Sequence, residues 1–256
     1  LARAAALIGI ALVNVGYFAY SPNMGGYANG ALDTLPDQAA FFGVNSLFTM
    51  KSYTLFSFMF GVGFAYQMAS AERAGTGFAG RYWRRIIGLF FFAAINIVLF
   101  FQGDILFIYA VLGSILFLFR NAGVKTLIGW AIGFYCVQLI FILLGAIGIS
   151  MGEAFAPDEM LKTRTLMEEE GADFVNAYAN GGFIATVTAR VTEWTGTIGY
   201  MLAFQGWGAM SFFLFGLAAV RNNLISKPDA KYWSKSRRIH LPIGIVLSLI
   251  GAYFLN

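Results

Sequence analysis

The chain has 256 residues, of which 59% are hydrophobic and 12% are charged, and its mean hydropathy is +0.69. A soluble domain of this composition would lack the polar surface needed to cover its apolar side chains, so an ordinary soluble protein is excluded and an integral membrane protein is predicted. The net charge of +4 indicates no nucleic-acid partner, because the basic residues are scattered between apolar segments and build no continuous basic face. The expected partner is the lipid bilayer.

Apolar segments recur along the whole chain. A transmembrane helix needs about 20 mostly apolar residues, and helices are required because backbone hydrogen bonds must be satisfied within lipid while the alternation of a closed barrel is absent. We therefore predict an all-α fold, a polytopic transmembrane helical bundle that forms one domain over residues 1–256 and that we expect to be truncated at both ends. About seven spans are predicted, at roughly 4–20, 52–70, 83–101, 104–119, 124–149, 197–220 and 241–256.

Segment 37–50 precedes the second span and is too short and too polar to cross a bilayer, so it is predicted to be an amphipathic helix. The third and fourth spans are joined only by Gln102 and Gly103, which predicts an antiparallel helical hairpin with almost no loop. Asp104 lies at this turn, directly before an apolar helix. Its plain role is that of an N-cap, where the carboxylate accepts backbone N–H bonds and meets the positive end of the helix dipole.

The longest polar segment, about 150–196, is predicted to be a helical loop outside the bundle. Two helical pieces are expected, 158–170 and 173–192, with the Asn-Gly-Gly sequence at 180–182 as a bend or break. The loop is either a solvated cap over the bundle or an element whose amphipathic second half lies on the membrane or closes a pocket. Its acidic residues are Glu153, Asp158, Glu159, Glu168, Glu169, Glu170, Asp173 and Glu193.

The distribution of charge predicts the orientation, because loops rich in Lys and Arg remain in the cytoplasm. With a cytoplasmic N-terminus, the outer segments keep few basic residues and hold most of the acidic ones, so we expect this orientation. The basic residues then placed inside are Arg3, Arg73, Arg81, Arg84, Arg85, Arg120, Lys125, Arg221, Lys227, Lys231, Lys235, Arg237 and Arg238. Those placed outside are Lys51, Lys162, Arg164 and Arg190.

Polar side chains inside the spans are costly in lipid, so they usually face protein or water, and an ionisable one marks a candidate site. With a rise of about 1.5 Å per residue, Asn14 lies near mid-membrane. The other polar residues of the spans cluster in the outer half or at the outer rim, which predicts a hydrated or ligand-filled cavity that opens outward. They are Lys51, Ser57, Asn96, Gln102, Asp104, Gln138, Arg190 and Gln205.

Several of these residues also have a plain structural role. Lys51 is suited to snorkelling to the outer interface. Arg84 and Arg85 are either positive-inside anchors or a basic pair that holds the phosphates of a cofactor. The amides are more often interhelical hydrogen-bonding groups than reactants. They are Asn14, Asn96, Gln138 and Gln205.

The motifs of soluble enzymes are absent or misplaced. GISMG at 148–152 fits G-x-S-x-G, but it ends a span and His240, the only histidine, lies across the membrane, so a serine hydrolase is excluded. No P-loop or Cys/His metal spacing appears and Cys136 is the only cysteine, so no metal site is predicted. The glycines of FGVGF at 60–64 are interpreted as residues that permit close helix packing.

Three stretches carry a family resemblance. They are RAAALIGIALVN at 3–14, KSYTLFSFMFGVGFAYQ at 51–67 and RRIIGLFFFAAINIVLFFQGDILFIYAVLG at 84–113. Together they resemble the YeiB-like family of bacterial membrane proteins, and weaker similarity continues through YANGGFIATVTARV at 178–191 and the span that ends at Arg221. That family is grouped with a superfamily of transmembrane acyltransferases that includes lysosomal heparan-glucosaminide N-acetyltransferase and the sugar O-acetylating enzymes.

The resemblance implies a protein of the bacterial inner membrane that transfers an acyl group from cytosolic acyl-coenzyme A to an acceptor in the envelope. Basic residues at the inner face would then meet the phosphates of coenzyme A, and outer polar residues would hold the acceptor. The candidate cofactor-binding residues are Arg3, Arg84 and Arg85, and the candidate substrate-binding residues are Lys51, Gln102 and Arg190.

The chain departs from the wider superfamily at two positions. In the sugar O-acetylating enzymes an arginine is followed after ten residues by a histidine, and at that spacing from Arg3 this chain has Asn14, as YeiB-like proteins do. YeiB-like relatives commonly carry a histidine in the third span, where this chain has Asn96. An amide cannot act as a general base, because it has no proton to exchange near neutral pH. Asn14 and Asn96 are therefore candidates to position a carbonyl or to donate to an oxyanion.

Asp104 is then the candidate general base, with Lys51 or Arg190 as its charge partner. The loss of both histidines leaves a second hypothesis open, a non-catalytic membrane subunit of a larger complex that is derived from such an enzyme. A transporter or lipid-handling protein is the third hypothesis, although no internal repeat of the kind found in transporters is recognisable.

Overall fold

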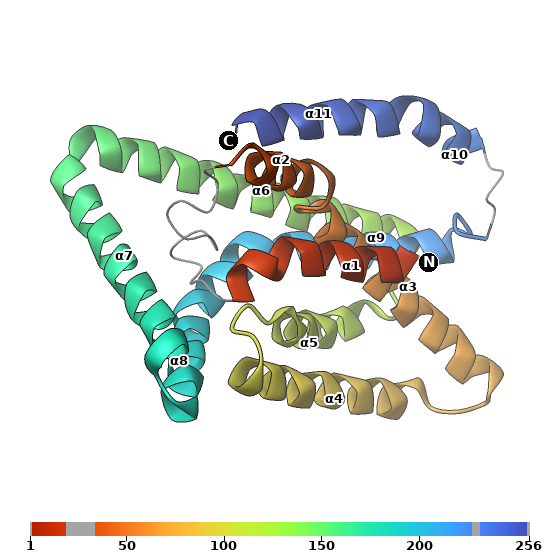
Figure 1. The fold of residues 1–256 in the computed structure, drawn as a ribbon. Coiled ribbons are helices and arrows are strands. Elements are labelled where there is room, and N and C mark those ends of the chain that lie inside the picture. Colours follow the sequence, from red (N-terminus) through yellow and green to blue (C-terminus); the bar gives the residue numbers. More distant parts are fainter. Residues whose placement is uncertain (1, 19–33, 227–230, 255–256) are drawn as a thin grey trace.

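The computed structural model describes residues 2–18, 34–226 and 231–254, and in these ranges the chain forms helices and short turns with no strand (Figure 1). The predicted all-α fold is therefore confirmed for this part of the chain. The α-helices are α1 Ala2–Asn14, α2 Leu35–Leu47, α3 Lys51–Arg73, α4 Phe78–Leu99, α5 Ile105–Leu116, α6 Val124–Phe155, α7 Pro157–Asn180, α8 Phe183–Met201, α9 Trp207–Arg221, α10 Lys231–Lys235 and α11 Leu241–Phe254. The short 3₁₀ helices are η1 Val15–Phe18 and η3 Phe117–Phe119, and the π-helical segments are η4 Leu202–Gly206 and η5 Ser236–His240.

Three helices within the described ranges are long and apolar enough to cross a membrane, namely Phe78–Leu99, Val124–Phe155 and the continuous Phe183–Arg221. Two further apolar helices are shorter, at Ala2–Phe18 and Ile105–Phe119. Large apolar side chains of these helices are exposed, as at Leu143 and Leu144 of α6. A contiguous apolar surface of this kind is matched to lipid rather than to water. The chain is therefore a helical membrane protein.

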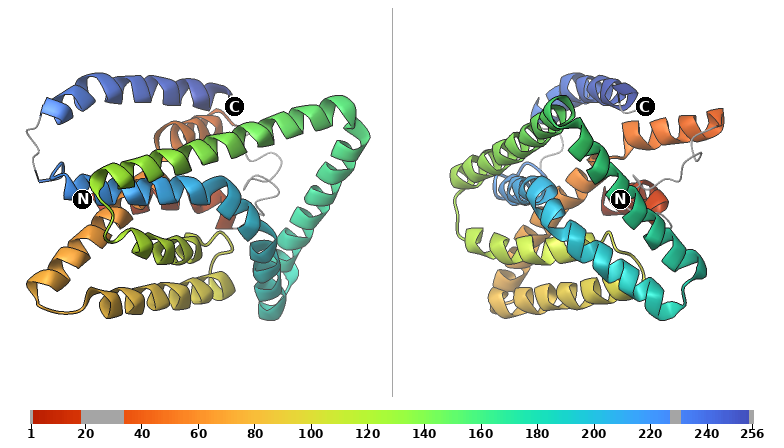
Figure 2. Two further views of the ribbon diagram at one scale, coloured as in Figure 1. Left: turned by 180° about the vertical axis from the view of Figure 1, so that it is seen from behind. Right: turned by 90° about the vertical axis from the view of Figure 1, so that its left-hand side faces the viewer.

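The core lies where α3 and α9 cross, with α5 and α6 packed against α9, and with α1 and α4 packed against α3. Phe60 of α3 stacks on Phe213 of α9, with ring centroids 4.4 Å apart. Tyr109 of α5 packs edge-on against both rings, at 5.6 Å and 5.1 Å. Figures 1 and 2 show α4 and α5 as neighbouring antiparallel helices on one side of the crossing, which confirms the predicted hairpin.

The α3 and α9 helices approach each other at backbone distance. A Cβ atom added at Gly61 would lie 1.9 Å from the Phe213 carbonyl oxygen, and one added at Gly216 would lie 2.1 Å from the Phe58 carbonyl oxygen. Neither position has room for a side-chain atom, so glycine is required at both. The interpretation of FGVGF at 60–64 as a close-packing sequence is confirmed at Gly61.

The α6, α7 and α8 helices lie along three sides of an open triangle (Figure 1). The predicted bend at 180–182 is confirmed, because α7 ends at Asn180 and α8 begins at Phe183. The predicted division of the first piece at residue 170 is wrong, since α7 is continuous and Gly171 lies inside it. A single glycine costs a helix only about 1 kcal/mol and does not have to break it. The predicted end of the outer loop, near residue 196, does not interrupt the helix either, because α8 continues through η4 into α9.

The predicted short helix at 37–50 is present as α2, with Thr34 as its N-cap. The α11 helix packs beside α2, and the Ser248 hydroxyl donates a hydrogen bond to the Ser46 carbonyl. The far ends of two predicted spans, 19–20 and 255–256, lie outside the described residues. The bundle thus places the α4–α5 turn, η1 and the start of α3 near one another, and this region contains most of the predicted site residues.

Candidate functional site

Asn96 organises the turn between α4 and α5. Its carbonyl accepts hydrogen bonds from the backbone N–H groups of Phe100 and Phe101, both at 2.8 Å, and these bonds end the helix. Its side-chain Nδ2 donates to Oδ2 of Asp104 at 2.6 Å. One asparagine therefore closes α4 and also holds the carboxylate that begins the next helix.

Asp104 is buried in the turn, outside both helices, with only 1% of its surface exposed. Its Oδ1 accepts a hydrogen bond from the backbone N–H of Phe107 at 2.7 Å, so the predicted N-cap is confirmed. Burial raises the pKa of the Asp104 carboxyl above its ordinary value, and the hydrogen bonds from Asn96 and from the backbone oppose this rise. The side chain is thus both a structural cap and an acidic group held in a desolvated place.

The expected charge partners of Asp104 lie elsewhere. Lys51 is exposed, and its Nζ donates to the Asn45 carbonyl at 3.2 Å. Arg190 lies on α8, with its guanidinium 5.8 Å from the ring centre of Tyr178. No hydrogen bond or ion pair between described residues joins either cation to Asp104, whose side-chain partner is the Asn96 amide.

A cavity of about 450 Å³ opens beside the hairpin, with Gly103 of the turn in its wall. Asn14 and Gln205 both line it, so two polar residues from distant parts of the sequence share one space. None of the described side chains that line it is charged; the polar ones are amides and hydroxyls, and the others are apolar. Next to it, buried Gln102 donates from Nε2 to the Tyr17 carbonyl at 2.7 Å, while its Oε1 has no hydrogen-bond partner among the described residues. The cavity is therefore suited to an uncharged group that can form hydrogen bonds.

The π-helical segment η4 forms part of the wall of this cavity. Such segments insert an extra residue into a helical turn and occur frequently at functional sites. The hydroxyl of Tyr53 donates to the carbonyl of Gln205 in this segment. Tyr53 thus connects the start of α3 to the widened turn.

Replacing Tyr53 with phenylalanine is expected to destabilise the protein by about 1 kcal/mol, because the Gln205 carbonyl then loses its donor. Thermal unfolding in detergent measures the effect. Tyr66→Phe is the matched control, since Tyr66 lies on the same helix with an exposed side chain. Equal unfolding temperatures of the two variants would show that the bond to Gln205 contributes nothing.

A second polar cluster lies at the middle of α3. Arg3 Nη2 donates to the Met59 carbonyl at 3.3 Å, and the Arg85 guanidinium lies over the Phe60 ring, 4.9 Å from its centre. The positive charges of Arg3 and Arg85 lie near enough to repel each other. The buried Nη1 of Arg85 has no hydrogen-bond partner among the described residues. Two guanidinium groups in one place attract an anionic group such as a phosphate.

Two observations distinguish Arg3 and Arg85 from the neighbouring Arg84. A Cβ atom at Gly63 would lie 2.4 Å from Nη2 of Arg3, so a glycine there gives Arg3 room to reach α3. Arg84 is exposed, and its Nε donates to the Gly80 carbonyl of its own helix at 3.3 Å. Of the basic pair at 84–85, only Arg85 therefore joins Arg3.

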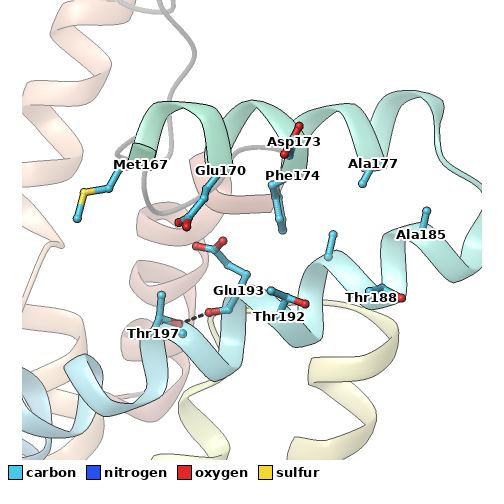
Figure 3. A pocket seen from close by; sticks show the side chains of 12 residues that line it. Met167, Glu170, Asp173, Phe174, Ala177, Ala185, Thr188, Thr192, Glu193 and Thr197 are labelled. Carbon is cyan, nitrogen blue, oxygen red and sulfur yellow. Dashed lines mark hydrogen bonds between the residues drawn. The ribbon is translucent and has the colours of Figure 1, made fainter. Parts of the chain in front are cut away.

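A hollow of about 760 Å³ lies between α7 and α8. Figure 3 shows Glu170 of α7 and Glu193 of α8 with their carboxylates directed toward each other, and Asp173 also lines the hollow. Thr197 lines both this hollow and the cavity beside the hairpin, so the two are neighbours along α8. In the part of the chain that the structure describes, no group of three or more His, Cys, Asp or Glu side chains is arranged to hold a metal ion.

The structure brings some of the predicted polar residues together and separates others. Asn96 bonds to Asp104, and Asn14 shares the cavity with Gln205. Gln138 packs on α9 and does not line the cavity. Several tyrosines near these groups could not be recognised from the sequence, because only the direction of a side chain around its helix distinguishes them from tyrosines of the core or of the membrane interface. These are Tyr17, Tyr53 and Tyr178.

The fold and these side chains define a helical membrane protein with a buried carboxylate–amide pair beside an uncharged cavity. The chain is 30% identical over 270 residues to the uncharacterized protein YxaH of Bacillus subtilis (strain 168), a match that covers 99% of this chain and 64% of that protein. It is 33% identical over 150 residues to an uncharacterized 39.9 kDa protein in the amylase 3′ region of Bacillus acidopullulyticus, a match that covers 58% of this chain and 40% of that protein. The matches thus span less than two thirds of the length of these relatives. No family model and no solved structure matches the chain.

Proposed function

We propose that this chain is part of a multi-pass acyltransferase of the bacterial inner membrane, similar to the YeiB-like proteins. The enzyme takes an acyl group from cytosolic acyl-coenzyme A and transfers it to an acceptor on the outer side. The proposed topology has about seven spans and a cytoplasmic N-terminus, with α7 and part of α8 outside. The charge distribution along the sequence supports this topology.

The observation that carries the proposal is that α4 contributes one residue to each of two different polar clusters. Arg85 and Asn96 both lie on α4, and their separation of eleven residues corresponds to about 16 Å along the helix axis. The arginine cluster is suited to the phosphates of coenzyme A. The Asn96–Asp104 pair lies near the uncharged cavity, which is suited to a hydroxyl-bearing or amide-bearing acceptor.

The proposed reaction uses these residues in the following way. The acceptor hydroxyl or amine attacks the thioester carbonyl, its O–H or N–H bond breaks, and Asp104 takes the proton. The carbonyl–sulfur bond breaks as the new ester or amide forms, and the coenzyme leaves as a thiolate that is then protonated. In this proposal Asn96 holds the carboxylate, and Asn14, which lines the cavity, donates a hydrogen bond to the developing oxyanion.

The arginine cluster gives the first test. Arg85→Gln is expected to weaken binding of acetyl-coenzyme A about tenfold or more, because a charged hydrogen bond to phosphate is lost. Arg84→Gln removes the same charge one residue away and is expected to change the affinity little. Isothermal titration calorimetry on the purified protein measures both. Absence of coenzyme binding by the unaltered protein would refute the proposed donor.

One observation favours the second candidate function, a non-catalytic subunit of a larger membrane assembly. Both oxygens of Asp104 already accept hydrogen bonds, from Asn96 and from the Phe107 backbone, as in a purely structural cap. Purification in mild detergent distinguishes the two functions. A partner retained at fixed stoichiometry, together with no acyl transfer by the complex, would favour the subunit.

A further inference from the structure

Three buried polar groups gather where α7 meets α8. The Nε of Arg190 and the Nε1 of Trp194 are buried and have no hydrogen-bond partner among the described residues, and the buried hydroxyl of Tyr178 lies beside the Arg190 guanidinium. Arg190 is only 6% exposed. Buried donors without acceptors are rare, because each forfeits its hydrogen bonds to water. These groups therefore indicate an acceptor that binds here.

The three side chains lie close together. The guanidinium of Arg190 is 5.8 Å from the ring centre of Tyr178. Trp194 follows Arg190 by four residues, so both project from the same face of α8. Trp194 also packs edge-on against Phe107 of α5, at 5.0 Å. The donors thus sit between the outer helical pair and the bundle, on a framework fixed by aromatic contacts.

Acidic residues line the neighbouring hollow of Figure 3. They are Glu170, Asp173 and Glu193, and neither Arg190 nor Trp194 is among the residues that line that hollow. The α7 helix is polar, whereas α8 runs without a break into the apolar α9. Arg, Trp and Tyr side chains at such a boundary are typical of the level of lipid headgroups.

We propose that Arg190, Tyr178 and Trp194 form a binding site for a phosphate group, supplied by a phospholipid headgroup or by a soluble phosphate. A phosphate offers several acceptor oxygens to the three donors, and arginine is the preferred cation for such a group. A phosphate bound at this site would contact both α7, through Tyr178, and α8, through Arg190 and Trp194. The inference does not depend on acyl transfer, because it uses neither Asp104 nor the cluster of Arg3 and Arg85.

The experiment measures binding by the purified, delipidated chain in detergent. One arm adds phosphatidylglycerol or, as the phosphate-free counterpart, diacylglycerol, and counts retained lipids by native mass spectrometry. The other arm adds inorganic phosphate and records the unfolding temperature. Retention of phosphatidylglycerol but not diacylglycerol identifies a headgroup site, and stabilisation by inorganic phosphate identifies a soluble ligand. Failure of both arms overturns the proposal.

Variants assign the binding to this place. Arg190→Gln is expected to weaken it about tenfold or more, because a charged donor is lost. Arg164→Gln is the matched control, since Arg164 lies on α7, is exposed and pairs with Glu153. If Arg190→Gln does not fold, Tyr178→Phe decides, with an expected loss of about 2- to 10-fold. Equal loss in Arg164→Gln, or no loss in Tyr178→Phe when it is the deciding variant, would contradict the assignment.

Discussion

Replacing Gly216 with alanine is expected to lower the free energy of unfolding by about 3 kcal/mol or more, at the upper end of the range for overpacked cores. The added Cβ atom would lie 2.1 Å from the Phe58 carbonyl oxygen and 2.9 Å from the Val62 nitrogen. These are backbone atoms within a helix, so no rotation of a side chain can relieve the clash. The α3 and α9 helices would have to move apart, and the stack of Phe60 on Phe213 would be lost with them.

Unfolding of the purified protein in mixed detergent, followed by circular dichroism, measures this change. Gly61→Ala on the facing helix is expected to behave in the same way. Gly133→Ala in α6 is the control, because nothing lies within 4 Å of its Cβ position. Alanine is the better helix former, so the control should be unchanged or stabilised by up to about 1 kcal/mol. Unfolding of Gly216→Ala at the midpoint of the unaltered protein would show that the two backbones are not in contact.

Replacing Asp104 with asparagine is expected to reduce acyl transfer about 100-fold or more while leaving stability almost unchanged. Asparagine is as good an N-cap as aspartate, so the bond from the Phe107 backbone is retained. The Asn96 side chain keeps its contact by turning its amide, so that its oxygen accepts from the new NH2 group in place of the present Nδ2 donation. An amide cannot take a proton from the acceptor, so the contribution of general base catalysis is lost. Turnover of labelled acetyl-coenzyme A with an envelope extract as acceptor measures the first effect, and thermal unfolding measures the second.

Asp104→Ala separates the two roles of the carboxylate further. This variant loses the cap as well, and it is expected to be less stable by about 0.5–2 kcal/mol than Asp104→Asn. Full turnover in Asp104→Asn would leave Asp104 with a structural role only. No turnover even in the unaltered protein, alone or with added partners, would argue for the non-catalytic subunit.

Much of the local structure could be predicted because it depends on neighbours in the sequence. The Asp104 cap needs only a carboxylate directly before an apolar helix, and the bend at 180–182 needs only adjacent glycines. Composition was enough to indicate a helical membrane protein. The close approach at Gly61 was also foreseeable, because glycine in an apolar helix usually marks a contact.

The arrangement of the site could not be predicted in the same way. Position along a helix gives the depth of a residue but not the direction in which its side chain points. Lys51 and Arg190 were therefore plausible partners for Asp104, although the structure directs them elsewhere. The unbroken passage from α8 into α9 was also hidden, since Gly196 and Gly199 look like breaks but lie within a helix that continues through both.

The continuity of α8, η4 and α9 has a mechanical consequence. With no loop to absorb a displacement, a tilt of the α8 end of this rod is transmitted toward the bundle core. The α9 end is held by the glycine crossing with α3, so η4 is the place where the rod can flex. Because Gln205 belongs to this joint, any molecule that shifts α7 and α8 would also reshape the cavity wall beside the hairpin.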